Sequence, residues 1–159
     1  MTNNDIIRRL RYTFDYSDDQ MIELFKLGRT EVTRAQVSDW LKKDETVQVK
    51  LMDIELSSFL NGMIVKNRGA KEGVVMENER QLNNNLIFRK LRIAMAFKDT
   101  DIIKVYDKVG MNISKHELSA IFRKPDQRQY RACLDQFLRN FLLGLQLRER
   151  GNKEVELAE

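Results

Sequence analysis

An internal repeat constrains the fold of this chain more than any other feature. Residues 4–11 align with residues 85–92, and the same offset of 81 positions continues to about residue 124. Beyond residue 126 the offset becomes 82, and it holds through residues 150 and 151. Because one register extends over nearly the whole chain, we predict two tandem copies of one unit of about 80 residues. Units this small bury little core alone, so we expect them to pack together with pseudo-two-fold symmetry.

Each unit is predicted to contain four helices, which makes the fold class all-α. The first helix of unit one covers residues 4–14, where apolar residues recur at helical spacing. The second begins at Ser17 or Asp18 and ends near Gly28, which is typical of a helix C-terminus. The third begins after Thr33, and its counterpart begins after Ser114. In both copies a Gln or Glu three residues later predicts a capping box.

The fourth helices, over about 47–66 and 128–148, are the most apolar, and we expect them to form the central core. Glycine inside a helix lowers helix stability by about 1 kcal/mol relative to alanine. Gly62 and Gly144 are therefore best explained by close helix crossings, where a larger side chain would not fit. We expect the two units to meet there. The matched core positions are Met52, Leu56, Phe59, Leu60 and Met63 in unit one, and Leu134, Leu138, Phe141, Leu142 and Leu145 in unit two.

The chain divides into two units and a linker. We predict unit one over 1–68, a linker over 69–83, unit two over 84–151 and a frayed tail over 152–159. The linker contains glycines and a charged run, which are typical of a connection rather than a helix. Its apolar segment Val74-Val75-Met76 could pack onto one unit.

Composition indicates a folded protein in water. Apolar residues make up 42% of the chain and charged residues 33%, which is typical of globular proteins and not of disordered ones. No apolar segment approaches the roughly 20 residues that span a bilayer, and residues 1–5 lack the start of a signal peptide. We therefore expect a cytoplasmic location and no membrane partner.

The residues that usually carry chemistry are scarce, and we predict no catalytic residue, no cofactor and no metal site. His116 is the only histidine and aligns with Ala35, while Cys133 is the only cysteine. Neither belongs to the pattern that both units share. We expect His116 to be solvated in the first turn of a helix and Cys133 to be a small buried apolar residue.

The matched carboxylates Asp53 and Asp135 have two interpretations. Both lie on mostly apolar helices, where a charged side chain is unusual. One interpretation is that they act in acid–base catalysis. The favoured interpretation is an ion pair with a nearby arginine such as Arg11 or Arg92.

Basic residues recur at matched positions in both units, and the chain carries a net charge of +4. Phosphate groups bind well to such residues, because arginine contacts them in a bidentate manner and each contact releases counterions. The alternative is a solvated face whose cations pair with nearby Asp and Glu. The candidate anion or nucleic-acid contacts are Arg8, Arg11, Arg34, Gln36, Lys42, Lys43, Arg89, Arg92, Lys115, Arg123 and Lys124.

Residues 33–41 resemble the recognition helix of repressor-type helix-turn-helix proteins, with a hydroxyl cap and a Trp-Leu anchor. Two departures weaken that resemblance. Residues 28–32 form a longer turn than the usual three or four residues, and the second copy has Glu117 where the first has Gln36.

A wider resemblance covers almost the full chain. It rests on the Ile-x-Arg-x-Leu-Arg pattern of the first helix, on residues 37–45, on Phe59 to Gly62, on Arg68-Gly69, and on their second copies. These segments resemble the YehS-like bacterial proteins, a tandem helical domain of unknown function. The resemblance implies a small cytoplasmic bacterial protein with a duplicated helical fold, and it brings no established catalytic or binding residue.

Two hypotheses for function follow. The first is a non-enzymatic adaptor that binds an unidentified protein partner in a groove between helices, which requires no special residues. The second is DNA or RNA binding through the duplicated basic positions. An enzyme ranks third, and the sequence does not indicate the oligomeric state.

Overall fold

A computed structural model describes residues 1–70 and 76–151, and every regular element within them is an α-helix. The all-α prediction with four helices in each unit is confirmed. Val74, Val75 and the predicted tail lie outside the described residues, whereas Met76 packs against the core. The helices are α1 (Asn3–Phe14), α2 (Asp18–Leu27), α3 (Arg34–Leu41), α4 (Asp53–Arg68), α5 (Asn84–Met95), α6 (Asp99–Asp107), α7 (Lys115–Phe122) and α8 (Asp135–Arg150).

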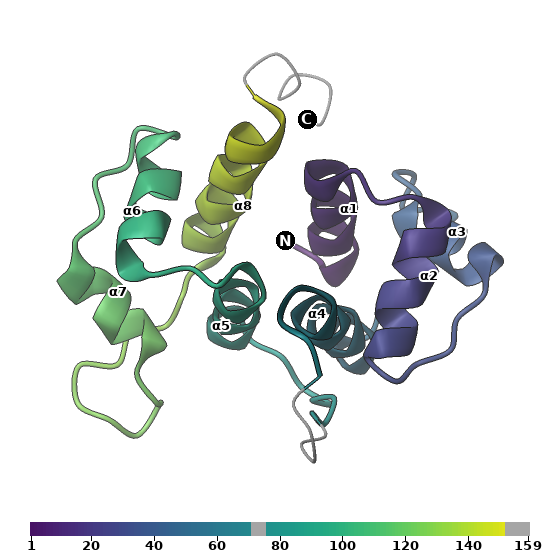
Figure 1. Cartoon of the computed structure of the whole chain (residues 1–159), viewed down its shortest axis with the longest axis horizontal. Helices are drawn as coiled ribbons and strands as arrows, with labels where there is room; N and C mark the ends of the chain where they lie inside the picture. The colour runs from purple at the N-terminus through teal and green to yellow at the C-terminus, as the bar shows by residue number, and fades with distance from the viewer. Residues whose placement is uncertain (71–75, 152–159) are drawn as a thin grey trace.

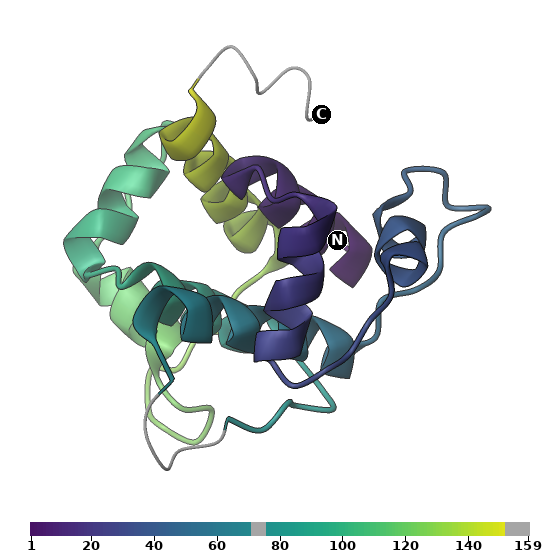
Figure 2. The same ribbon diagram turned by 45° about the vertical axis from the view of Figure 1, so that its right-hand side comes forward.

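Four helices form the centre of the molecule, and two pairs flank it. Helices α1, α4, α5 and α8 lie in the middle, with α2 and α3 on one side and α6 and α7 on the other (Figures 1 and 2). Helix α4 packs against α2 and α5, and α8 packs against α6 and α1. Because α5 repeats α1 and α8 repeats α4, the α1–α8 and α4–α5 contacts are equivalent. The units therefore meet through two matched helix pairs related by a pseudo-two-fold axis.

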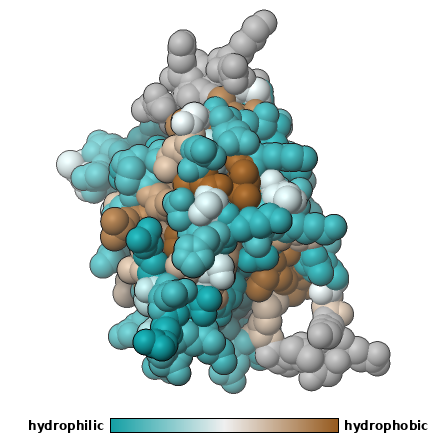
Figure 3. Space-filling view, turned by 90° about the vertical axis from the view of Figure 1, so that its left-hand side faces the viewer, coloured by the Kyte–Doolittle hydropathy of each residue, from teal (hydrophilic) through white to brown (hydrophobic). Residues whose placement is uncertain are grey.

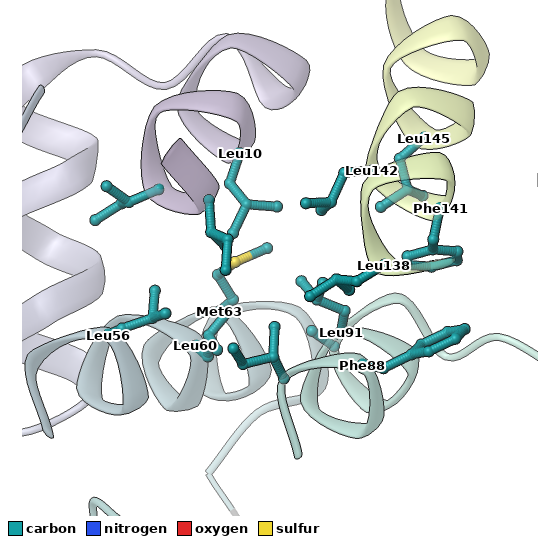
Figure 4. Packing of buried hydrophobic residues seen from close by; sticks show 14 of the residues in the cluster. Leu10, Leu56, Leu60, Met63, Phe88, Leu91, Leu138, Phe141, Leu142 and Leu145 are labelled. Atoms are coloured by element: carbon teal, nitrogen blue, oxygen red, sulfur yellow. The ribbon is translucent and has the colours of Figure 1, made fainter. Parts of the chain in front are cut away.

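One hydrophobic core extends across both units. Leu10 of α1, Met63 of α4, Leu91 of α5 and Leu142 of α8 are all buried, and they lie around a common centre (Figure 4). Burial of leucine-sized side chains contributes about 1.5–3 kcal/mol each, so this shared centre favours the two units docking together. The fourth helices contribute to the core as expected, and α1 and α5 complete it.

The predicted starts of the second and third helices are confirmed. Ser17 and Thr33 each accept a hydrogen bond from a backbone N–H three residues later, at 3.1 Å, and the glutamine there bonds back to the cap. Gly28 caps the end of α2. Ser114 begins α7 in the same way, but the Glu117 carboxylate contacts the Ser114 hydroxyl instead of its backbone N–H.

The predicted starts of the fourth helices are wrong. Helix α4 begins at Asp53 and α8 at Asp135, six and seven residues later than expected. The reason lies in Asn4, whose buried amide donates to the Val49 carbonyl at 2.8 Å and accepts from the Leu51 N–H at 3.0 Å. These bonds hold the preceding segment outside the helix. Asn85 bonds the equivalent segment before α8.

The two helix glycines do mark close crossings, but not between the units. A Cβ on Gly62 would lie 1.8 Å from the carbonyl oxygen of Leu24, which belongs to α2 of the same unit. On Gly144 it would lie 2.5 Å from the carbonyl oxygen of Val105 in α6. The glycines themselves therefore face a helix of their own unit, whereas the contact between the units near Gly62 comes from its neighbour Asn61, which accepts from Lys90 of α5. An apolar stripe with a glycine predicts a close neighbour without identifying it.

Candidate binding surfaces

Arg11 and Arg92 have the same structural role in the two units. Arg11 donates to the Tyr16 carbonyl at 3.1 Å and pairs with Asp18 at 2.9 Å. Arg92 makes the equivalent bonds to Phe97 and to Asp99, the latter at 3.1 Å. Each arginine therefore fixes the turn into the next helix, which accounts for its recurrence without any ligand. Neither arginine pairs with Asp53 or Asp135.

Three further candidates are in ion pairs on the surface. Arg8 pairs with Asp5 at 3.0 Å, Lys42 pairs with Asp39 at 2.8 Å, and Arg34 pairs with both Asp18 and Asp19. Exposed pairs of this kind contribute little to stability, about 0–1 kcal/mol. These ion pairs disfavour phosphate binding at the same residues, because a phosphate would have to displace the carboxylate from each cation.

The remaining basic candidates divide by exposure. Arg89 donates to the Phe122 carbonyl at 3.0 Å and is half-buried. Arg123 has a buried Nε without a hydrogen-bond partner in the part of the chain that the structure describes. Lys43, Lys115 and Lys124 are exposed, on both units.

The outer face of α3 is exposed, as the helix-turn-helix interpretation requires. Val37 and Trp40 are buried against the core, and Ser38 is exposed. Gln36 is part of the helix cap in this structure, because its Oε1 accepts the Thr33 N–H at 2.8 Å. The nucleic-acid role of this helix stays a prediction.

Asp53 and Asp135 each bond to one residue of their own unit and to one residue outside it. Asp53 accepts from Asn3 at 2.7 Å within its own unit and from the Leu82 N–H at 2.9 Å across the junction. Asp135 accepts from the amide of Asn84 at 2.7 Å and from the ammonium group of Met1 at 3.1 Å. The arginine partners expected for these carboxylates are therefore wrong. The hydrogen bond from Asn84, together with the ammonium group, lowers the pKa of Asp135.

A buried polar cluster, found only at the α4–α5 side, was not predicted. Lys90 of α5 is 8% exposed, pairs with Glu79 at 3.0 Å and donates to Asn61 at 2.7 Å. Ser57 also hydrogen-bonds to Glu79. Arg9, Arg139 and Leu143 are the counterparts of Lys90, Ser57 and Asn61, so the cluster is not repeated. This asymmetry was its only signal in the sequence.

Met52 and Leu134 were expected in the core but are exposed, at 53% and 71%. Each is the N-cap residue of its helix, in an extended conformation. An extended cap residue does not continue the helical stripe that begins one residue later. Both side chains are therefore left outside the core.

An apolar groove of about 510 Å³ lies between α7, α8 and residues 131–134. We call it the α7/α8 groove; its apolar lining is Met111, Ile121, Ala132, Leu134 and Phe137. Glu117, Arg131, Gln136 and Asn140 line the remainder. The side of the molecule that carries α6 and α7 is otherwise mostly hydrophilic, with separate hydrophobic patches (Figure 3). In unit one, Thr30 and Glu55 stand where the groove has Met111 and Phe137.

Comparison with known proteins places the chain in a family. The model of the family described as "Protein of unknown function (DUF1456)" matches residues 3–69 and again residues 84–151. The chain belongs to this family. It is also 41% identical over 155 residues to the uncharacterized protein YehS of Escherichia coli (strain K12), covering 96% of this chain and 99% of that protein. No solved structure matches.

The family unit, as it occurs twice in this chain, repeats its structural polar residues but not its reactive ones. Asn4 and Asp53 recur as Asn85 and Asp135, whereas Cys133 and His116 do not recur. Cys133 is buried and His116 is exposed, as predicted. Burial raises the pKa of Cys133 to about 12, so the thiol is a poor nucleophile near neutral pH.

Two further findings concern the described residues alone. Within residues 1–70 and 76–151, no group of three or more His, Cys, Asp or Glu side chains is arranged to hold a metal ion. Over the same ranges, no helix combines the length and the apolar character needed to cross a bilayer.

Proposed function

We propose that this chain is a non-enzymatic protein-binding module whose α7/α8 groove binds an amphipathic helix of a partner protein. The observation that carries the proposal is Leu134, a leucine that is 71% exposed at the edge of a formed apolar groove. Leu134 extends the apolar lining of the groove to the surface, and a contiguous apolar surface edged by polar residues is typical of an interaction site. An amphipathic helix covers such a groove by inserting apolar side chains spaced three or four residues apart.

The size of the groove is suited to this partner. Its volume of about 510 Å³ accommodates two or three apolar side chains, and its floor combines the aromatic ring of Phe137 with the aliphatic side chains of Met111 and Ile121. Aromatic and methionine side chains adapt well to apolar partners in such interfaces.

The charge around the groove favours an acidic flank on the partner helix. Residues 123–131 lead from the end of α7 to the wall of the groove. This loop carries Arg123, Lys124, Arg128 and Arg131 against one carboxylate, Asp126. Arg131 lines the groove, as does one carboxylate, Glu117, so the groove and its loop together carry four cations and two carboxylates. A helix with Asp and Glu beside its apolar face would therefore associate faster and in one orientation.

Nucleic-acid binding is the alternative. Exposed Lys43, Lys115 and Lys124 support it. We rank it second because five of the candidate cations, namely Arg8, Arg11, Arg34, Lys42 and Arg92, are in ion pairs with carboxylates of the protein. Fluorescence anisotropy with labelled DNA and RNA at low and high salt distinguishes the two, since phosphate contacts weaken steeply with salt.

Selection from a displayed peptide library tests the groove directly. We expect the protein to enrich peptides with apolar residues at i, i+3 or i+4 and i+7 and with flanking Asp or Glu. Binding of a selected peptide should weaken at least about tenfold in Leu134→Glu. The matched control is Met52→Glu, at the equivalent exposed cap of α4, which should leave the affinity unchanged.

Two outcomes would contradict the proposal. One is the absence of any enriched amphipathic pattern. The other is a selected peptide that binds wild type and Leu134→Glu equally well while Leu134→Glu keeps the wild-type melting temperature.

A further inference from the structure

A second cavity, separate from the α7/α8 groove, lies between α2 and α4 of unit one and α5 of unit two. It has a volume of about 980 Å³ and is formed by the C-terminal ends of α2 and α4 together with α5. We call it the α2/α4 pocket. Its volume is at the upper end of the range typical of small-molecule sites. The residues that matter for its chemistry are Lys26, Arg29, Ile64, Val65, Arg68 and Ile93.

One wall of the α2/α4 pocket is apolar. Ile64 and Val65 of α4 face it together with Ile93 of α5. Ile93 is 43% exposed. Its counterpart in unit one is Tyr12, whose ring is covered by the guanidinium of Arg150 at 4.2 Å. Ile93 has no such cover, so the pocket presents an apolar wall to its interior.

The pocket lining is also basic. Lys26, Arg29 and Arg68 line the pocket with a single carboxylate, Glu23. None of the three cations forms an ion pair or a side-chain hydrogen bond with another described residue. Arg68 differs in this from its counterpart Arg150, which donates to the Tyr12 carbonyl at 2.9 Å. The repeat therefore uses this arginine for packing in one half, and in the other half its side chain has no hydrogen-bond or ion-pair partner among residues 1–70 and 76–151.

Arg29 has a backbone conformation that favours glycine. Its φ is +75°, in the left-handed region, and the counterpart in unit two is Gly110, also with a φ of +75°. Glycine adopts this conformation without the steric penalty that a Cβ brings. The fold thus accommodates glycine here, yet unit one carries a strained arginine at the pocket. Strain of this kind points to a role for the side chain outside folding.

We propose that the α2/α4 pocket binds a small, free anionic molecule with an apolar body. The carboxylate, sulfonate or phosphate group of that molecule contacts Arg29, Arg68 and Lys26, because guanidinium groups make strong charge-assisted hydrogen bonds to such oxyanions. The apolar body lies against Ile64, Val65 and Ile93. This site is independent of the protein-binding groove.

The experiment is a fluorescence titration with 1-anilinonaphthalene-8-sulfonate, which combines an aromatic body with one sulfonate. We expect one site, with an affinity that falls about tenfold in Arg29→Gly and in Arg68→Gln, as expected for the loss of one charge-assisted contact. Arg29→Gly should keep or raise the wild-type melting temperature, since glycine relieves the strained φ. A loss of affinity therefore cannot be ascribed to unfolding.

Three controls make the result specific. Arg128→Gly removes an exposed arginine from the loop of the other unit and should leave the affinity unchanged. Leu134→Glu alters the α7/α8 groove and should also leave it unchanged, which separates this site from the proposed function. The neutral analogue N-phenyl-1-naphthylamine should bind more weakly than the sulfonate, and equally to wild type and Arg29→Gly.

The proposal is overturned if Arg29→Gly binds the sulfonate as tightly as wild type does, or if the neutral analogue binds wild type as tightly as the sulfonate. Sedimentation with dioleoylphosphatidylglycerol vesicles distinguishes a free ligand from a membrane surface. We expect wild type and Arg29→Gly to sediment with the vesicles to the same extent. If wild type binds the vesicles and Arg29→Gly does not, the ligand of the pocket is a lipid headgroup and not a free molecule.

Discussion

Replacing Gly62 with alanine sets two physical expectations against each other. Inside a helix, alanine is favoured over glycine by about 1 kcal/mol, so helix propensity alone predicts that Gly62→Ala stabilises the fold. The packing of α4 against α2 predicts the opposite, because the new Cβ would lie 1.8 Å from the Leu24 carbonyl oxygen.

The size of the overlap sets the magnitude. Real Cβ atoms essentially never approach another heavy atom within 3.0 Å, so α2 and α4 would have to separate by about 1.2 Å at this crossing. The obstacle is backbone, which cannot rotate away as a side chain can. Overpacking a core typically costs about 1–3 kcal/mol, and movement of a whole helix falls at the upper end. After the gain in propensity, we expect the free energy of unfolding to fall by about 2 kcal/mol.

Urea unfolding followed by circular dichroism measures this change, and Gly144→Ala provides the comparison. Its Cβ would lie 2.5 Å from the Val105 carbonyl oxygen, so a shift of about 0.5 Å suffices. We therefore expect Gly144→Ala to destabilise less than Gly62→Ala. A midpoint for Gly62→Ala at or above that of wild type would refute the argument, because propensity would then outweigh packing.

Three further predictions follow from buried polar groups. Asn4→Ala leaves the Trp40 and Val49 carbonyls and the Leu51 N–H without their partner. The free energy of unfolding, measured in urea, should therefore fall by about 3 kcal/mol. A decrease under about 1 kcal/mol would contradict the role assigned to Asn4. Burial raises the pKa of Glu79, but hydrogen bonds from Ser57 and Lys90 and the charge of Lys90 lower it overall, below its ordinary 4.5. The stability that Glu79 contributes is therefore present above pH 4.5 and lost as the pH falls through the lowered pKa. The stability difference between wild type and Glu79→Gln, from unfolding curves at pH 7 and pH 3, should shrink at pH 3, and a constant difference would exclude the carboxylate as the cause. Cys133, buried and with its pKa raised to about 12, should react with a thiol reagent such as 5,5′-dithiobis(2-nitrobenzoate) much more slowly in the native protein than in urea; equal rates would show that the thiol is accessible.

Local signals in the sequence predicted local structure well. Ser17 and Thr33 each occur three residues before a glutamine, and both begin a helix where expected, because the cap depends only on neighbouring residues. The starts of α4 and α8 failed for the opposite reason. The apolar residues Val47 and Val49 extend the apolar character of the helix, and hydrogen bonds from distant residues such as Asn4 hold their segment outside it.

The candidate site was less predictable, because it depends on the exact start of a helix and on partners that lie apart in the sequence. The recurrence of Arg11 as Arg92 suggested a binding role, yet their partners Asp18 and Asp99 recur as well and explain the pattern. The exposure of Leu134 follows from its place one residue before α8, and composition alone does not reveal such a boundary. The hydrogen bond between Asn3 and Asp53 could have been predicted from the repeat, because both residues recur, as Asn84 and Asp135.

The most direct test of the protein-binding account is an NMR titration of the ¹⁵N-labelled protein with a peptide selected for binding. The account predicts that the largest amide shifts fall in residues 117–121 and 131–137, around the α7/α8 groove, and that Leu134→Glu abolishes them. Shifts centred instead on α2, α3 or the α2/α4 pocket, or spread evenly over both units, would contradict it.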